Sequence, residues 1–170
     1  MRAGQIRKAR PSPWCEVRSS QVHGRGVFAS RPIPAGTRII EYVGEVITKK
    51  EAARRGVAQL ERAARTGDAA VYVFILDDKY DIDGNFEWNP ARLINHSCSP
   101  NCETEIDEQH HIWVIALRDI AMGEELFYDY HFDIDNFEDH PCRCGSPECI
   151  GFIVSRDHRK EVKRRLRKHK

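Results

Sequence analysis

The sequence has no long hydrophobic run. No stretch of its 170 residues approaches the roughly 18 consecutive apolar residues that a membrane-spanning helix needs, so we expect no transmembrane segment. The basic residues at the start of the chain are not followed by the apolar region of a signal peptide. We therefore expect an intracellular protein that folds in a reducing compartment.

The sequence also lacks internal repeats, and residues 15–153 contain no linker. With 41% hydrophobic and 31% charged residues, a chain of this length is expected to form one soluble domain with a real core. The predicted organisation is a basic N-terminal arm, a main domain, a cysteine-bearing segment and a basic C-terminal tail, at residues 1–14, 15–135, 136–153 and 154–170. The arm contains Pro11 and Pro13 and few apolar residues, so we expect it to be loose.

The net charge of +1 conceals basic ends and an acidic middle. Residues 1–14 carry four basic residues, and residues 154–170 carry nine basic and two acidic ones, which leaves 14 basic and 24 acidic residues between them. An acidic body favours a basic partner, such as a lysine-rich peptide. The basic ends are typical of solvated termini, of a nuclear signal or of weak nucleic-acid contact, although no aromatic residue is interleaved with the basic tail.

Hydrophobic patterning predicts many short strands and one or two helices, hence an α+β domain that is mainly β. The expected strands are two around a glycine turn within residues 15–28, one at 38–47 that is broken at Gly44, and others at 71–76, 113–117 and before Tyr130. Residues 80–84 are expected to turn out of the strand at 71–76. Alanine and leucine recur among charged residues between Lys49 and Thr66, which predicts a helix capped by Thr48 and ended by Gly67.

The densest polar stretch is residues 92–102, and we expect two other segments to meet it. Asn95, His96 and Ser97 can bond a polar ligand there, while Cys98 offers a thiolate to a metal. The first of the other segments is the Glu-Leu-Phe-Tyr-Asp-Tyr run that ends at Tyr130. The second is a C-x-C-x4-C tail, whose three cysteines need one more thiolate to complete a closed tetrahedral zinc site.

Two glycines flank one arginine in the run from His23 to Gly26. Glycine lets the backbone approach a ligand closely and adopts a positive φ without strain. The alternative interpretation of this G-x-G run is a tight hairpin turn that binds nothing.

The Asn-His-Ser-Cys segment, the Glu-Leu-x-Tyr-Asp-Tyr run and the C-x-C-x4-C tail, in this order, resemble the SET-domain lysine methyltransferases with a post-SET zinc segment, in particular the mixed-lineage-leukaemia and trithorax-like group. The resemblance covers most of the chain, roughly from His23 to Gly151. It implies a fold of short strands and small sheets with a pseudoknot, one helical insert and a zinc-bound tail. It also implies S-adenosylmethionine as cofactor and, as substrate, a lysine of a histone tail or a small basic DNA-associated protein.

The same resemblance assigns roles to individual residues. Tyr130 is the expected catalytic residue, Tyr128 limits the product to one or two methyl groups, and Tyr42 lies near the lysine channel. The residues expected to bind the cofactor are His23, Gly24, Arg25, Gly26, Tyr72, Arg92, Asn95, His96 and Arg143. The expected zinc ligands are Cys98, Cys142, Cys144 and Cys149, with Cys102 as a competing ligand and Cys15 as a buried thiol outside the site.

Each of these assignments has a plainer alternative. Tyr128 and Tyr130 alternate on one strand, which is typical of core packing, and Asn95 and His96 are common in turns. The helix at 49–66 is either one wall of a substrate groove or a packing element, and the cysteines are either zinc ligands or reduced thiols. For the whole chain, the rival is a non-catalytic zinc-stabilised module that binds basic peptides or nucleic acid.

Overall fold

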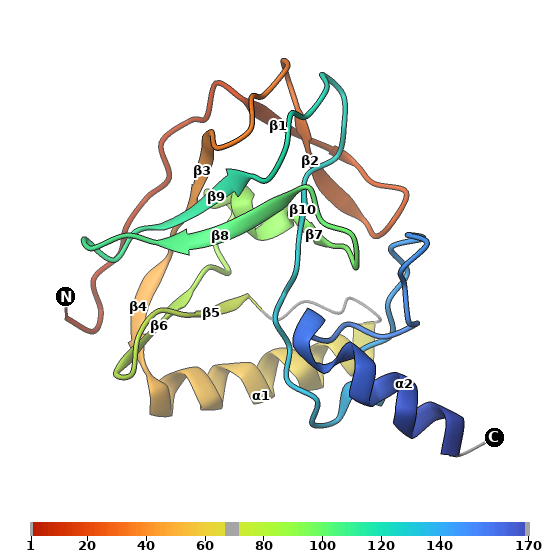
Figure 1. The fold of residues 1–170 in the computed structure, drawn as a ribbon. Coiled ribbons are helices and arrows are strands. Elements are labelled where there is room, and N and C mark those ends of the chain that lie inside the picture. Colours follow the sequence, from red (N-terminus) through yellow and green to blue (C-terminus); the bar gives the residue numbers. More distant parts are fainter. Residues whose placement is uncertain (1, 67–71, 169–170) are drawn as a thin grey trace. The chain divides into compact units, whose positions relative to one another are not determined.

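The computed structural model describes residues 2–66 and 72–168 (Figure 1). The described residues fall into two compact units, each made of three stretches of chain. Unit 1 contains residues up to 12, 40–92 and 105–114, and unit 2 contains residues 13–39, 93–104 and those from 115 onward. None of the described helices is long and apolar enough to cross a membrane.

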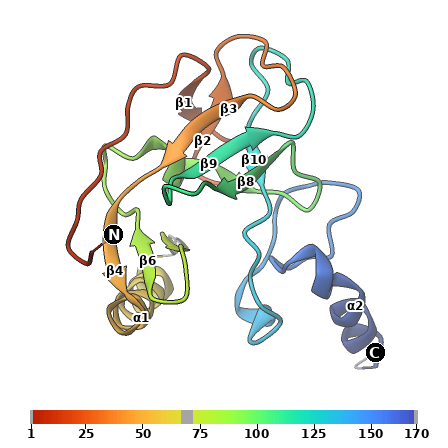
Figure 2. The ribbon, with the colours of Figure 1, turned by 60° about the vertical axis from the view of Figure 1, so that its left-hand side comes forward.

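Unit 1 is built on a small antiparallel sheet and one long helix. The sheet has the strand order β4(Glu45–Thr48), β6(Tyr80–Asp83), β5(Val73–Ile75). Helix α1(Lys49–Thr66) follows β4 directly, and Figure 2 looks nearly along this helix, with β4 and β6 beside it. Val46 and Ile47 of β4 and Ile82 of β6 are buried.

The helix has the bounds that the sequence predicted. The side-chain oxygen of Thr48 accepts a hydrogen bond from the backbone N–H of Glu51 at 3.3 Å, as an N-cap residue does. Arg55 in α1 then reaches Glu45 and Asp83, each at 2.7 Å, so the helix is tied by charge to two strands of the sheet. The predicted terminator, Gly67, lies outside the described residues.

The predicted strand at 71–76 is present as β5, and its first predicted residue, Val71, lies outside the described residues. Two other expectations about unit 1 were wrong. Residues 80–83 form the central strand β6 rather than a turn. Residues 4–7 are also not loose, because Gly4 and Arg7 donate backbone hydrogen bonds to Val46 and Gly44 at 2.8 and 2.9 Å. Backbone pairing of this kind needs no apolar side chains, so composition gave no sign of it.

The predicted break at Gly44 separates β3(Arg38–Tyr42) from β4. A Cβ atom at Gly44 would lie 2.0 Å from the backbone oxygen of Asp83, so this close backbone approach requires glycine. Strand β3 belongs to a three-stranded sheet of order β3, β9(Ile112–Ala116), β8(Cys102–Ile106). The turn between β8 and β9 is the polar hairpin that the sequence predicted, in which Asp107 accepts a hydrogen bond from the backbone N–H of His111.

Unit 2 contains the predicted hairpin and the two short strands that matter for the site. The strands β1(Cys15–Ser19) and β2(Arg25–Ala29) pair antiparallel around the glycine turn. The short strands β7(Asn95–His96) and β10(Phe127–Tyr128) pair parallel. The 3-10 helix η1(Pro90–Leu93), whose residues 90–92 belong to unit 1, precedes β7 in the chain.

The C-terminal residues of unit 2 are also folded rather than only solvated. They form the 3-10 helices η2(Phe137–Asp139) and η3(Arg156–His158), followed by helix α2(Arg159–Lys168) (Figure 1). Phe137, Val154 and Val162 are buried together as a small apolar core, against which Leu166 packs. The basic tail therefore has one apolar face that holds it to the preceding segment.

Candidate active site

The parallel pairing of β7 with β10 brings together the two motifs that the sequence expected to meet. Asn95 lies opposite Phe127, and His96 lies opposite Tyr128. The side chain of buried Asn101 continues the connection, because it accepts a hydrogen bond from the backbone N–H of Phe127 at 2.8 Å and donates one to the backbone oxygen of Glu125 at 2.7 Å. The expectation that these segments meet is confirmed.

Tyr130 follows β10 and is held by two bonds to the β7 segment. Its hydroxyl donates a hydrogen bond to the backbone oxygen of Ile94 at 2.9 Å. Its backbone N–H donates to Nδ1 of His96 at 3.2 Å. Its ring lies 5.1 Å from that of Tyr128, which is buried, whereas Tyr130 itself is only partly buried. The phenol is therefore fixed in direction but not enclosed by the core.

His96 is a buried, neutral imidazole. Burial lowers its pKa from 6.5 to about 4, although the nearby Asp129 carboxylate opposes the shift. Because Nδ1 accepts the hydrogen bond from Tyr130, the proton of the neutral ring lies on Nε2, which faces the sulfur of Cys98 at 3.6 Å. The two ring nitrogens of His96 thus connect the backbone of Tyr130 to the sulfur of Cys98.

The glycine turn is joined to the same place by Asn95. Its amide nitrogen donates to the backbone oxygens of His23 and Arg25, at 3.4 and 3.1 Å, and to the carboxylate of Glu125 at 2.9 Å. A Cβ atom on Gly26 would lie 2.2 Å from that carboxylate, so a side chain at the second glycine of the motif would displace Glu125 from its present position. Four of the predicted cofactor residues, from His23 to Gly26, therefore lie beside Asn95.

Glu125 is a site residue that the sequence interpretation missed. Its second carboxylate oxygen accepts a hydrogen bond from the hydroxyl of Ser20 at 3.0 Å, and its first contacts Asn95 as described above. The signal was present, because Glu125 belongs to the motif that ends at Tyr130. Two consecutive glutamates in a turn, however, are usually solvated, and nothing local marked one of them as a partner of residues about a hundred positions away.

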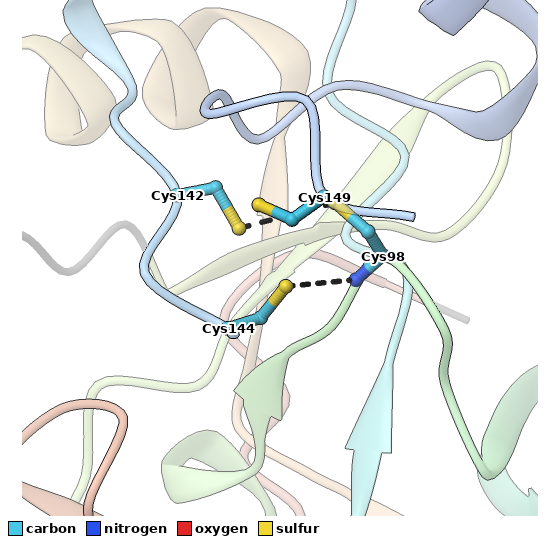
Figure 3. Close-up of side chains that lie close together, drawn as sticks. All are labelled: Cys98, Cys142, Cys144 and Cys149. Carbon is cyan, nitrogen blue, oxygen red and sulfur yellow. Dashed lines mark hydrogen bonds between the residues drawn. The ribbon is translucent and has the colours of Figure 1, made fainter. Parts of the chain in front are cut away.

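The four predicted metal ligands come together. The sulfurs of Cys98, Cys142, Cys144 and Cys149 lie within 4.8 Å of one another and point toward a common centre (Figure 3). A tetrahedral zinc ion with Zn–S distances of about 2.3 Å places its sulfurs about 3.8 Å apart. The sulfurs of Cys98 and Cys142 are 3.9 Å apart, which fits that arrangement.

The competing ligand Cys102 is buried but is not a member of this cluster. Burial raises the pKa of its thiol to about 12, so Cys102 is a neutral core thiol. Cys15 is only partly buried, whereas we expected a buried thiol.

The surroundings of the cluster disfavour negative charge on two of its four sulfurs. Burial raises the pKa of the Cys98 thiol to about 11 and raises that of Cys142 as well. Burial also disfavours the Cys144 thiolate, but hydrogen bonds from the Cys98 N–H and the Ser146 hydroxyl outweigh it and lower the pKa of Cys144 to about 6. Four thiolates this close together need a compensating positive charge, which a divalent metal supplies.

A second missed residue, Arg159, connects the C-terminal helix to the site. Its buried guanidinium donates to the backbone oxygen of Cys98 at 2.5 Å and to the carboxylate of Asp129 at 2.8 Å. Asp129 lies between Tyr128 and Tyr130, and it also accepts backbone hydrogen bonds from His131 and Arg156. No sequence signal separated Arg159 from the eight other basic residues of the tail.

The remaining predicted residues divide between the two units. In unit 1, the hydroxyl of Tyr42 donates to the backbone oxygen of Tyr72 at 2.7 Å, and the guanidinium of Arg92 lies over the Tyr72 ring at 5.0 Å. Nε of Arg92 is buried and has no hydrogen-bond partner among the described residues. In unit 2, Arg143 is exposed between two cysteines of the cluster.

Comparison with known proteins identifies the family. The SET domain model matches residues 24–131, and the chain belongs to the SET-domain family. It is 41% identical over 137 residues to the histone-lysine N-methyltransferase trithorax of Drosophila virilis, and 40% identical over 141 residues to the histone-lysine N-methyltransferase 2B of Homo sapiens. It is also 40% identical over 155 residues to an H3 lysine-4 specific histone-lysine N-methyltransferase of Yarrowia lipolytica.

These alignments cover 79%, 81% and 88% of the chain, but only 3%, 5% and 13% of the respective relatives. The chain thus corresponds to a small part of much longer proteins. The expected resemblance to the trithorax-like SET group is confirmed, as are the many small sheets and few helices of the predicted fold.

Replacing Arg159 should destabilise the protein much more than replacing a neighbouring arginine. Arg159→Met removes the partner of a buried carboxylate, which typically costs about 3 kcal/mol of unfolding free energy or more. Urea unfolding followed by tryptophan fluorescence measures this loss. Arg165→Met, on the exposed side of the same helix, is the matched control and should leave the midpoint unchanged. Equal midpoints for the two variants would show that the Asp129 contact contributes little.

Proposed function

We propose that this chain transfers a methyl group from S-adenosylmethionine to the side-chain amine of a lysine in a basic protein. The observation that carries the proposal is the position of Tyr130, whose hydroxyl is fixed on the Ile94 backbone oxygen beside the Asn95-His96 strand. Family membership supports it, because the relatives named above are histone-lysine N-methyltransferases.

The glycine turn and the residues joined to it fit an adenosyl cofactor. Gly24 has a φ of +46°, and nothing lies within 4 Å of where a Cβ atom would stand, so the turn is open to a ligand at that residue. We assign cofactor binding to this turn, to Asn95 and His96, and to Arg143 beside the cysteine cluster. The resemblance to the family gives the same role to Tyr72 and Arg92, and Nε of Arg92 is buried with no hydrogen-bond partner among the described residues.

When bound, S-adenosylmethionine supplies an electrophilic methyl group on a sulfonium. The lysine amine attacks that carbon with its lone pair, so the amine must be neutral and aligned with the breaking carbon–sulfur bond. Tyr130 positions the amine with its hydroxyl and neighbouring backbone oxygens, and the resemblance to the family gives Tyr42 a role near the lysine. A desolvated channel lowers the pKa of the entering lysine and so favours its neutral form. No covalent enzyme intermediate is needed.

The proposed substrate is a histone tail or another small basic protein. The acidic middle of the chain, with 24 acidic against 14 basic residues, attracts such a partner over a distance. The relatives named for histone lysines point to the same chemistry and to a chromatin substrate. A binding module without catalysis is the second candidate, and the assay described next separates the two.

Tyr130→Phe should lower the rate of methyl transfer by roughly 100-fold, because the loss of one positioning hydroxyl misaligns the amine. Labelled-methyl transfer to mixed histones and basic DNA-associated proteins measures this, with mass spectrometry locating the label. Tyr80→Phe, which removes a hydroxyl from strand β6, is the control and should keep its activity. If the unmodified protein neither transfers label nor binds the cofactor in calorimetry, the chain is a binding module.

Tyr128→Phe should increase the number of methyl groups that the product lysine carries. The Tyr128 hydroxyl and the water it can hold are proposed to crowd a methylated amine, so that the native chain stops after one or two additions. Removing that hydroxyl leaves room for a third methyl group. Mass spectrometry of the product peptide after exhaustive reaction counts the methyl groups. An unchanged count in the variant would remove Tyr128 from this role.

We further propose that the cysteine cluster holds one structural zinc ion, with all four positions occupied by thiolates. Cys98 lies just after β7, and the other three ligands lie in the segment 136–153. The ion would therefore fix that segment beside Asn95 and His96. In this role the metal takes no part in the chemical step, because no position remains for water or substrate.

Purified protein should contain about one zinc ion per chain, and a strong chelator should release it with loss of tail structure. Cys98→Ala should abolish zinc binding, measured by atomic absorption, because a ligand is lost. Cys102→Ala removes a buried thiol of the same kind that lies outside the cluster, and it should retain the metal. Equal zinc content in the two variants would refute the assigned ligand set.

A further inference from the structure

The outward side of helix α2 presents a continuous basic surface, which we call the α2 basic face. It consists of Lys160, Lys163, Arg164 and Arg167, which are all exposed and line one shallow surface hollow. Their spacing of three, four and seven residues places them on one side of an α-helix. The four cations therefore gather on one surface rather than being scattered around the helix.

The opposite side of α2 holds this surface in a fixed orientation. Val162 is fully buried against Phe137 and Val154, and Leu166 packs on the same apolar core. Arg159, at the start of the helix, is buried and bonded to Asp129 and to the Cys98 backbone. The basic residues are thus carried by an anchored helix, which is a different situation from a disordered basic tail.

Charge on this helix is poorly balanced. Helix α2 contains seven basic residues and one acidic residue, Glu161. The carboxylate of Glu161 contacts Arg164 at 2.8 Å and Arg165 at 3.2 Å, so its single negative charge is shared between two arginines. Most of the positive charge of the α2 basic face remains available to an anionic partner.

We propose that the α2 basic face binds the phosphate backbone of duplex nucleic acid without reading its sequence. From Lys160 to Arg167 the helix rises about 10 Å, at about 1.5 Å per residue. One strand of a duplex places a phosphate about every 3.4 Å along the axis, so the face spans about three phosphates. Lysine and arginine are the side chains that contact phosphates, and α2 contains no aromatic residue on which unpaired bases would stack.

An acidic protein would match the same charge but fits the surface less well. Stable protein partners usually bury an apolar or aromatic centre inside a polar rim. The exposed side of α2 has no such centre, because its apolar residues, Val162 and Leu166, face the core of unit 2. A duplex requires only the cations, so nucleic acid is the better occupant. This inference does not depend on methyl transfer.

The test is binding of the whole chain to a fluorescein-labelled random duplex of 20 base pairs, measured by anisotropy between 50 and 200 mM salt. A variant in which Lys160, Lys163, Arg164 and Arg167 are all changed to glutamine removes the face. We expect it to lose at least about tenfold in affinity at the lower salt, and the slope of log K against log salt to fall by about three to four. All four positions are exposed, so the thermal midpoint should be unchanged.

The matched control changes Lys8, Arg31, Lys50 and Lys79 to glutamine, which alters net charge equally at exposed positions outside α2. It should keep most of the affinity. Equal losses in both variants would show a net-charge effect and overturn the proposal. Tighter binding of polyglutamate of matched charge than of the duplex would also overturn it, in favour of an acidic protein partner. A variant with each lysine of the face changed to arginine, and each arginine to lysine, should bind as the native chain does.

Discussion

The site depends on a parallel pairing only two residues long, between β7 and β10. This pairing sets His96 opposite Tyr128. A further hydrogen bond, from the backbone N–H of Tyr130 to Nδ1 of His96, joins the same two segments just beyond the paired residues. Such a short ladder cannot be stable alone, and side chains reinforce it from both ends. Asn101 bonds the backbone of the second strand, while Asn95 bonds the glycine turn and Glu125. The tyrosines are therefore placed by hydrogen bonds between loops rather than by a broad sheet.

Next to this pairing lie a neutral imidazole, that of His96, and a buried ion pair between Asp129 and Arg159. Buried His96 stays neutral and directs its two nitrogens to Tyr130 and Cys98. Asp129 precedes Tyr130 in the chain. Its carboxylate contacts the guanidinium of Arg159 and accepts hydrogen bonds from two backbone N–H groups, those of His131 and Arg156. A neutral imidazole beside the cysteine cluster adds no positive charge that would compete with a metal ion. The ion pair between Asp129 and Arg159, in turn, connects the segment that carries Tyr128 and Tyr130 to helix α2.

The sequence predicted best where periodicity or motif order carried the information. The helix from Lys49 to Thr66 followed from alanine and leucine recurring among charged residues, and the four clustered cysteines followed from the resemblance to a family. It predicted poorly where contacts are made by backbone atoms or by common side chains. The backbone hydrogen bonds from Gly4 to Val46 and from Arg7 to Gly44 leave no trace in composition. Arg159 resembles every other basic residue of the tail, and only burial distinguishes it.

The contacts that assemble the site also have a kinetic consequence. Ser20 and Glu125 are separated by 105 positions, Asn95 and Arg25 by 70, and Cys98 and Cys144 by 46. Each of these contacts closes a long loop, and the entropy of closure must be lost before the contact forms. From loop length alone, we expect helix α1 and the β1–β2 hairpin to form early from local contacts, and the tyrosine and cysteine loops to form after them. The candidate site is thus the part of the molecule that we expect folding to complete last.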